Sequence, residues 1–382
     1  MKPKIYLSPP HIDKKEFDYV NQALISNWIA PFGPDILDFE NAVQSYLDQG
    51  HFVTALNSGT SAIHLALKLL KVIKDDIVLC QSFTFVATAN PITYLGAIPI
   101  FVDSEIETWN MCPNFLEEAI QNCIKLNKKP KAIVFVDLYG MPAKIDEILD
   151  IAAKYNIPVI EDSAEALGSE YKNKKCGTFG DFSIFSFNGN KIITTSGGGA
   201  LVSRQKKYKD KALFYATQSK DLALHYQHTE VGFNYRLSNI CASIGKGQME
   251  VLNTRVKQRQ TNHQFYQKLF SDNKYISVFN NKNKDFKSNY WLTCILVNSN
   301  PKFNNLDLIT YLVSNGIEAR PLWKPLHLQP LFKNNVFYGN KVSSTLFQQG
   351  VCLPSGSNLS LQDKDFITKV ITKFFNNLKY NV

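Results

Sequence analysis

The strongest constraint on the fold is a regular alternation of strand and helix signals between residues 52 and 205. Short apolar segments that predict strands lie at residues 52–56, 77–80, 98–102, 132–136, 159–161 and 183–187. Segments with helical spacing of apolar residues lie between them, at residues 60–72, 113–125 and 143–155. Nearly continuous apolar strands that alternate with helices are typical of a mostly parallel sheet covered on both faces. The sequence therefore predicts an α/β fold for this part of the chain.

The rest of the chain predicts a second, smaller unit. Residues 238–269 carry apolar residues at helical spacing with few helix breakers, which favours one long helix leaving the large domain. A polar segment rich in Asn and Lys, residues 280–288, is expected to be an exposed loop. Beyond it we expect one strand and two helices, at residues 290–297, 306–315 and 361–378. We therefore expect a large domain over residues 1–250 and a smaller α+β domain over residues 251–382.

Charge and composition narrow the classes of function. The chain has 42 basic and 33 acidic residues, a net charge of +9, but its five arginines and scattered lysines form no basic tract or arm. A nucleic-acid partner is therefore not expected. No apolar run approaches the ~20 residues needed to span a bilayer, and the first residues lack a signal-peptide pattern, so no membrane association is expected.

Cysteine and histidine positions bear on the compartment and on metals. The seven cysteines are widely spaced and contain no Cys-x-x-Cys pair, which argues against a disulfide framework and a zinc site and suits the reducing cytoplasm. His225 and His228 could share one helix face, but no third ligand is evident. We therefore predict no metal site and a cytoplasmic location.

A lysine in a turn rich in glycine and asparagine is the first candidate for chemistry. The predicted strand at 183–187 leads into residues 186–191 (SFNGNK), and three glycines follow at 197–199. Such a turn can hold Lys191 rigidly in a cleft, where desolvation favours the neutral amine that attacks carbonyl groups. Because the chain has 37 lysines, most of them surface charges, the turn alone would not single out Lys191.

Two further segments supply what a phosphate-bearing pyridine cofactor would need. The apolar strand before Asp162 ends in carboxylates, and ligands bind at the C-terminal ends of strands in open α/β sheets. A carboxylate there can pair with the protonated pyridine nitrogen of pyridoxal phosphate (PLP), although Asp162 could instead cap a helix that begins at Ser163. Residues 57–61 (NSGTS) join a strand to an apolar helix, whose N-terminus could bind phosphate or could be an ordinary helix start.

Taken in order, these segments resemble the DegT/DnrJ/EryC1/StrS family of PLP-dependent nucleotide-sugar aminotransferases, nearly end to end. The stretches that carry the resemblance are residues 26–34, 56–67, 82–87, 160–168, 186–199, 232–239 and 320–327. Residues 7–11 and the NGNK turn resemble most closely the branch that aminates C4 of a UDP-linked 4-keto-6-deoxy-N-acetylhexosamine, a precursor of bacillosamine-type sugars. The resemblance implies an aspartate-aminotransferase-like α/β fold (fold type I), with residues 1–35 packed near the active site.

The resemblance also implies cofactor-binding roles. Lys191 would form the Schiff base with PLP and shuttle the proton, and Asp162 would keep the pyridine nitrogen protonated. The phosphate would be bound by Ser186 together with Gly59, Thr60 and Ser61. Phe85 would stack on the cofactor ring, and the alternative is that it is a core residue. Glu165 lies where many relatives have Gln or His near the cofactor hydroxyl, so the role of a carboxylate there stays open.

Other implied roles concern the substrate and a partner subunit. Asn234 would reach the phosphate of the neighbouring subunit's cofactor, which implies a homodimer with shared active sites. The expected substrate-binding residues are Ile29, Ala30, Asn188, Arg236, Arg320, Trp323 and His327. Arginine binds anions through two parallel hydrogen bonds, but Arg236 could instead be structural, and Trp323 and His327 could be interface residues.

The implied reaction moves an amino group from L-glutamate through PLP to the keto carbon of a UDP-linked sugar. A dTDP- or GDP-linked keto sugar is the alternative acceptor. Sugar dehydratases related to this family typically replace the lysine with histidine, so Lys191 argues against that chemistry. Intact Lys191, Asp162 and Ser186 also argue against a non-catalytic homologue.

Overall fold

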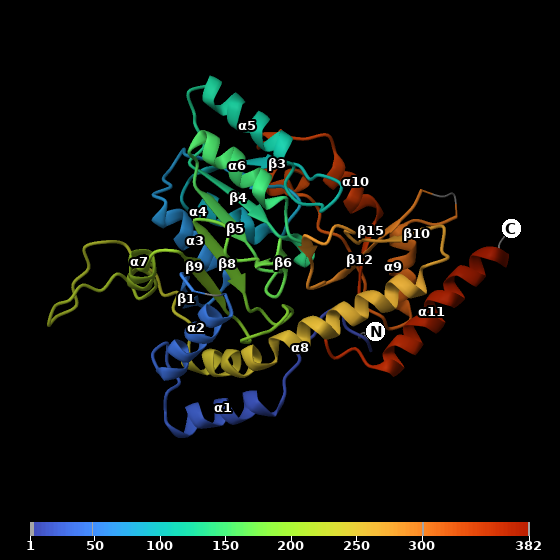
Figure 1. The fold of residues 1–382 in the computed structure, drawn as a ribbon, viewed down its shortest axis with the longest axis horizontal. Helices are drawn as coiled ribbons and strands as arrows, with labels where there is room; N and C mark the ends of the chain where they lie inside the picture. The colour runs from blue at the N-terminus through green and yellow to red at the C-terminus, as the bar shows by residue number, and fades with distance from the viewer. Residues whose placement is uncertain (1–3, 48, 300–301, 381–382) are drawn as a thin grey trace.

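A computed structural model describes residues 4–47, 49–299 and 302–380, and its centre is an eight-stranded sheet in the order β1-β9-β8-β5-β4-β2-β3-β14 (Figure 1). The strands are β1 (Phe52–Leu56), β2 (Ile77–Gln81), β3 (Ile98–Val102), β4 (Ala132–Val136), β5 (Val159–Asp162), β8 (Phe182–Ser186), β9 (Gly199–Ser203) and β14 (Phe337–Tyr338). From β8 to β14 in the sheet order, neighbouring strands run parallel, whereas β9 is antiparallel to β1 and β8. The six predicted strands are confirmed to within one residue at each end, but β9 and β14 are not predicted.

Helices cover both faces of this sheet, as predicted. Their bounds are α3 (Gly59–Leu69), α4 (Asn90–Tyr94), α5 (Pro113–Lys125), α6 (Ile145–Tyr155) and α7 (Lys206–Ala216). On one face Val78 and Cys80 of β2 share a core with α3, α4 and α7, and on the other Ile77 and Leu79 share a core with α5 and α6. Because successive side chains of a strand point to opposite faces, a strand buried on both sides must be apolar throughout.

The long helix α8 (Asn239–Leu269) joins the large sheet to a smaller C-terminal sheet (Figure 1). It packs against α1 (Lys14–Ile25) and α2 (Pro34–Tyr46), and its C-terminal end shares a core with the small sheet, whose strand order is β10-β12-β15-β13. These strands and the helices beside them are β10 (Ile276–Val278), β12 (Thr293–Val297), β13 (Arg320–Pro321), β15 (Gly350–Leu353), α9 (Asn305–Ser314), α10 (Val342–Gln349) and α11 (Leu361–Tyr380). The long helix predicted at 238–269 is thereby confirmed.

The expected domain boundary at residues 250 and 251 falls inside α8, and the two-domain division stays a prediction. The C-terminal part of the chain also contributes to the large sheet, because β14 pairs with β3 and Leu326 and Phe332 enter the core of one sheet face. Part of the predicted exposed loop at 280–288 forms β11 (Phe286–Lys287), which pairs with the small strand β6 (Glu170–Tyr171). Among the described helices, none is both long and apolar enough to cross a bilayer.

A buried ion pair fastens α2 and the segment before α8 to strand β1. The Glu40 carboxylate, 1% exposed, accepts a hydrogen bond from the Ala55 backbone N–H at 2.8 Å and another from the Arg236 guanidinium. Arg236 also donates to the Ala55 carbonyl at 3.1 Å, and Lys209 Nζ lies 3.3 Å from the second Glu40 oxygen. These contacts support the structural alternative for Arg236, because its guanidinium is already paired inside the protein.

Replacing Glu40 with alanine should destabilise the fold, because it leaves the Arg236 charge buried without a counter-ion. Breaking one side of a buried pair typically costs roughly 3–5 kcal/mol. The matched control is Glu117→Ala, which removes an exposed partner of Lys154 and should change stability little. Urea unfolding of both variants checks this, and equal losses in the two would contradict the structural role of the pair.

Candidate active site

A cavity of about 310 Å³ opens at the edge of the large sheet where β1, β2, β4, β5 and β8 end. The residues predicted as functional that line it are Gly59, Thr60, Phe85, Asp162, Glu165, Ser186, Asn188, Lys191 and Trp323. Lining residues that sequence reasoning does not predict include Asn57, Thr84, Thr88, Asn190 and Trp291. The parallel strands bring these distant segments together, because their C-terminal ends share one edge.

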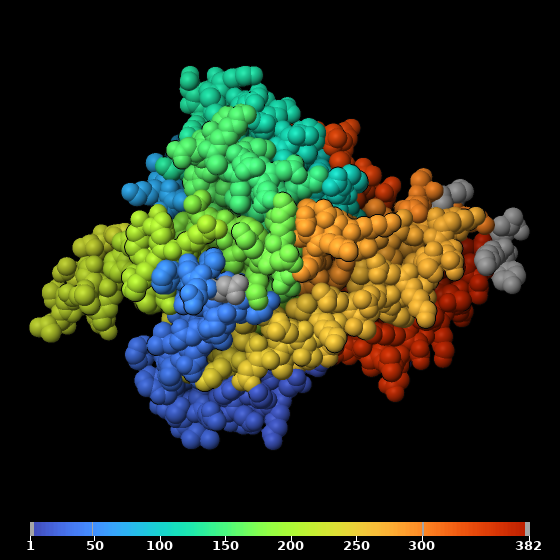
Figure 2. Space-filling model, viewed as in Figure 1, coloured from blue at the N-terminus to red at the C-terminus, as the bar shows by residue number. Residues whose placement is uncertain are grey.

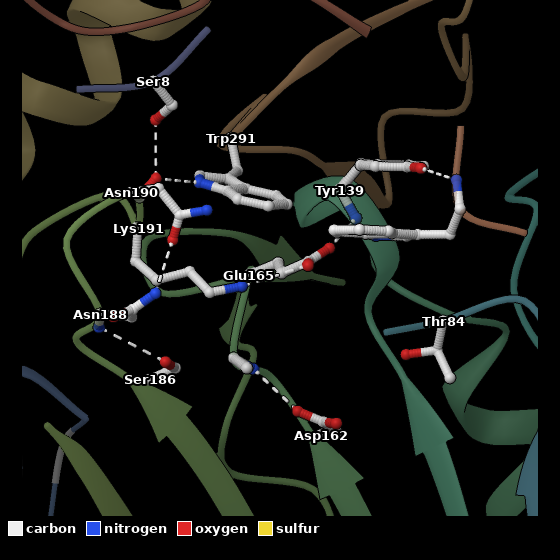
Figure 3. A network of polar contacts seen from close by, with 12 residues as sticks. Ser8, Thr84, Tyr139, Asp162, Glu165, Ser186, Asn188, Asn190, Lys191 and Trp291 are labelled. Atoms are coloured by element: carbon white, nitrogen blue, oxygen red, sulfur yellow. Dashed lines mark hydrogen bonds and ion pairs between the residues drawn. The ribbon is translucent and has the colours of Figure 1, made fainter. Parts of the chain in front are cut away.

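The Lys191 amine is held inside this cavity (Figure 3). Its side chain is 12% exposed, and Nζ lies 3.2 Å from Oε1 of Glu165 and 4.1 Å from the centre of the Trp291 ring. The second oxygen of Glu165 accepts a hydrogen bond from the Tyr139 backbone N–H at 2.7 Å. A carboxylate and an aromatic face both attract a cation, so the amine has a fixed place and a fixed direction.

The turn that carries Lys191 is anchored by segments distant in sequence. The Asn190 carbonyl accepts hydrogen bonds from Ser8 Oγ at 2.6 Å and from the Trp291 indole N–H at 2.7 Å (Figure 3). Ser8 belongs to the N-terminal segment, and Trp291 precedes β12 of the small sheet. The N-terminal segment and the segment before the small sheet therefore both anchor the peptide bond between Asn190 and Lys191.

Asp162 stands at the end of β5 with its carboxylate buried. Its Oδ2 accepts a hydrogen bond from Thr88 Oγ1 at 2.8 Å, and its Oδ1 accepts one from the Ala164 N–H at 3.2 Å. Burial raises the pKa of Asp162 to about 6. No helix begins at Ser163, where the chain forms a turn, so the helix-cap alternative is wrong. Both hydrogen-bond donors to this carboxylate are neutral. A pyridinium N–H would therefore supply the positive counter-charge that the buried carboxylate lacks.

The N-terminus of α3 forms the other end of the cavity. Ser58 caps the helix by accepting a hydrogen bond from the Ser61 N–H at 3.0 Å, and Ser61 Oγ donates to Asn57 at 2.6 Å. Ser61 therefore holds the turn itself, while Gly59 and Thr60 face the cavity. A Cβ on Gly59 would lie 3.2 Å from Cβ of Ser186, which shows how closely the two meet. Free N–H groups and hydroxyls at a helix N-terminus suit a phosphate.

Aromatic rings form the opposite wall. The rings of Phe85 and Trp323 lie 5.1 Å apart, and the Tyr139 ring is nearly parallel to those of Trp291 and Trp323. The Tyr139 hydroxyl accepts a hydrogen bond from the Trp323 backbone N–H at 2.8 Å. Sequence analysis does not predict Tyr139 or Trp291, since neither lies in a polar motif, and Trp291 reads as the start of a core strand.

Seven predicted site residues do not line the cavity within this chain: Ile29, Ala30, Ser61, Asn234, Arg236, Arg320 and His327. Arg320 is exposed and pairs with Glu318, with 3.1 Å between the charged atoms. The His327 ring lies 2.7 Å from Ser82 Oγ and stacks on Phe337, and burial lowers its pKa. The side-chain oxygen of Asn234, an exposed residue, accepts a hydrogen bond from Gln218 at 3.1 Å. Their roles stay predictions.

Beneath the site, the described residues contain one group with metal-ligand geometry, Asp137, Glu161 and Cys176. All three are buried, and Ser163 Oγ donates to both carboxyl groups, at 2.8 Å and 3.0 Å. Glu161 also accepts from Gly177 N–H and Ser183 Oγ. Burial and the neighbouring Glu161 charge raise the pKa of Asp137 well above its usual range. These oxygens are therefore engaged in hydrogen bonds that support β5.

Comparison with known proteins decides the family. The sequence profile of the DegT/DnrJ/EryC1/StrS aminotransferase family matches residues 10–373. The chain belongs to this family. It is 48% identical to EpsN of Bacillus subtilis, assigned as a pyridoxal phosphate-dependent aminotransferase, over 99% of this chain and 98% of EpsN. Identity is 37% to the GDP-perosamine synthase of Escherichia coli O157:H7, over 96% and 97% of the two chains.

Two further relatives bear on the fold and the substrate. A UDP-4-amino-4,6-dideoxy-N-acetyl-beta-L-altrosamine transaminase of Campylobacter jejuni is 33% identical over 98% of each chain. The PLP form of the sugar aminotransferase Spr1654 of Streptococcus pneumoniae superposes with a TM-score of 0.90, at 26% identity, covering 98% of this chain and 99% of that one. The predictions of fold type I, PLP dependence and aminotransferase activity are thereby confirmed.

Asp162→Asn should stabilise the cofactor-free protein at neutral pH while abolishing its use of PLP. A folded-state pKa of about 6, above 3.8, means that the buried charge opposes folding above pH 6 and that this cost disappears as the pH falls towards 3.8. The difference corresponds to roughly 3 kcal/mol at neutral pH.

Urea unfolding of cofactor-free wild type and Asp162→Asn at about pH 7 and about pH 5 tests this expectation. The difference in the free energy of unfolding between Asp162→Asn and the wild type should be smaller at the lower pH, because wild-type Asp162 is then partly protonated. Glu165→Gln is a suitable comparison at the same cavity. A gap that stays constant or widens on acidification would contradict the assignment.

Proposed function

We propose that this chain transfers an amino group from L-glutamate to C4 of a nucleotide-linked 4-keto-6-deoxy sugar, with a UDP-linked N-acetylhexosamine as the acceptor. The observation that carries the proposal is the arrangement of Lys191, Asp162 and the α3 N-terminus around one cavity. PLP, when bound, supplies an aldehyde for the amine and an electron-withdrawing ring. The remaining work falls to residues of the chain.

Each of these residues has a distinct task. Lys191 offers the amine that holds the cofactor and later carries a proton at Nζ. Glu165 accepts a hydrogen bond from that amine, so it can orient Nζ and hold the positive charge when Lys191 is released. Asp162 keeps the ring nitrogen protonated, and Gly59, Thr60 and Ser186 hold the phosphate. The side chains of Phe85, Trp291 and Trp323 exclude water from the cofactor ring.

The acceptor is the least constrained part of this proposal. The UDP-linked sugar rests on the resemblance of residues 7–11 and the NGNK turn, and on the named activity of the Campylobacter relative. A GDP-linked deoxy sugar is the second candidate, because the Escherichia coli relative that makes a GDP sugar has the higher identity, 37% against 33%. Arg320 is exposed and follows a segment that pairs with the N-terminal residues, and it would bind a diphosphate by exchanging its surface partner Glu318.

We further propose that two copies of this chain form a homodimer. Residues 217–235 form an arm that stands away from the body of the molecule (Figure 1, Figure 2), and bridges at Thr217–Asn234 and Lys220–His228 hold it together. Leu222 and Leu224 on this arm are fully exposed, and Tyr226 is 79% exposed. An apolar tip of this kind suits burial against a second copy, which would bring Asn234 towards the neighbouring site.

Leu222→Asp with Leu224→Asp should weaken dimerisation by at least tenfold, because it places charges in an apolar contact. Sedimentation over a range of concentrations measures the effect. Leu126→Asp, at an exposed apolar position just after the C-terminal end of α5, is the matched control. A dimer as stable in the arm variant as in the control would remove the arm from the interface.

The acceptor assignment is tested by incubating the PLP enzyme with L-glutamate and 4-keto-6-deoxy sugars linked to UDP, dTDP or GDP. We expect an amino sugar from the UDP-N-acetyl compound at a kcat/KM at least tenfold above the others, and none with Lys191→Ala. Mass spectrometry of the product identifies it. Preference for the GDP sugar would favour the second candidate, and transamination by Lys191→Ala at the wild-type rate would overturn the role of the lysine.

A further inference from the structure

Arg259 of α8 lies buried behind the turn that carries Lys191. Its side chain is 1% exposed, and its guanidinium donates to the Trp291 carbonyl at 2.6 Å and to Ser8 Oγ at 3.0 Å. It also donates to the carbonyl of Lys191 itself at 3.3 Å and to that of Ser355 at 3.4 Å. One side chain therefore contacts the N-terminal segment, the lysine turn and the small sheet.

The partners of Arg259 also hold the preceding peptide. Ser8 and Trp291, both bound by Arg259, each donate a hydrogen bond to the Asn190 carbonyl (Figure 3). The two consecutive carbonyls at residues 190 and 191 are thus fixed, one by Arg259 directly and the other through its partners. A planar guanidinium can place several hydrogen bonds in fixed directions, which a lysine cannot do.

We propose that Arg259 is a positioning residue for the aminotransferase reaction, fixing the peptide of Lys191 so that its amine keeps its place in the cavity. This inference rests on the proposed role of Lys191. Small errors in the placement of a reacting group cost large factors in rate, so a residue that fixes the turn affects catalysis without touching substrate.

The positive charge of Arg259 should also affect the protonation of the nearby site, which a residue that only packs would not do. The four acceptors named above are all neutral oxygens, and burial together with the nearby Arg255 lowers the pKa of Arg259 to about 9. At neutral pH a cation therefore lies behind the turn. It should disfavour a second positive charge on the nitrogen that joins Lys191 to the cofactor. The other charged groups around the turn are Glu165 and Asp162 in the cavity, and Arg255, which contacts His11.

Two substitutions separate position from charge. Arg259→Lys keeps the charge but loses the fixed directions of the hydrogen bonds, whereas Arg259→Gln loses both. Arg255→Lys is the matched control, because Arg255 lies one helical turn away and is equally buried, but binds His11 and Asp13 and not the lysine turn.

The experiment uses the PLP enzyme and follows its visible absorbance band against pH, together with kcat and KM for L-glutamate. We expect kcat to fall roughly 10- to 100-fold in both Arg259 variants with KM changed much less. The pH midpoint of the band should rise in Arg259→Gln and stay near wild type in Arg259→Lys and Arg255→Lys. Thermal unfolding run alongside separates these effects from a loss of fold.

The outcomes distinguish this proposal from the role of Lys191. If Lys191→Ala lacks the band but Arg259→Gln keeps the wild-type kcat and midpoint, or loses stability alone, the positioning role is overturned while the lysine assignment stands. If Lys191→Ala keeps the band, the lysine assignment fails and the positioning role fails with it.

Discussion

The parallel run of β8, β5, β4 and β2 is the constraint on which the site depends. Both faces of these strands are buried under helices, so polar side chains can reach solvent only where the strands end. Asp162 and Ser186 stand at two adjacent ends, and the Lys191 turn follows the second. Strand β9 runs antiparallel beside β8, and the pairing of Gly199 with Ser186 holds together the two ends of the segment that contains Lys191.

The site concentrates charges that folding alone would not favour. Asp162, the Glu165–Lys191 pair and Arg259 are all largely withdrawn from water. Each is held by hydrogen bonds to neutral groups or to another charge, as buried charged groups must be. The positive charge expected on a bound PLP ring would pair with Asp162. The cofactor-free protein is therefore less stable than one with neutral groups at these positions, because these charges are already buried before the cofactor binds.

Local patterns in the sequence predict six strands of the large sheet and its main helices, and together with the family resemblance they predict nine of the 21 residues that line the cavity. Lys191, Asp162 and Ser186 could be found because Asp162 and Ser186 stand at the ends of apolar strands and Lys191 lies in the turn after the second of them. Tyr139, Trp291 and Arg259 could not, since their contacts join segments far apart in the chain and depend on how the small sheet packs against α8. The Glu40–Arg236 pair cannot be predicted for the same reason, because its members lie 196 positions apart in the sequence. Strand β9 was missed because its start, Gly199, belongs to a run of glycines typical of a turn.

The most direct test of the account is to find where the cofactor is attached. The enzyme is loaded with PLP, reduced with borohydride to make the link permanent, digested and mapped by mass spectrometry. The account predicts a single modified peptide containing Lys191, with Glu165 and Trp291 beside it in the folded enzyme. Attachment at a different lysine, with Lys191 unmodified, would contradict it.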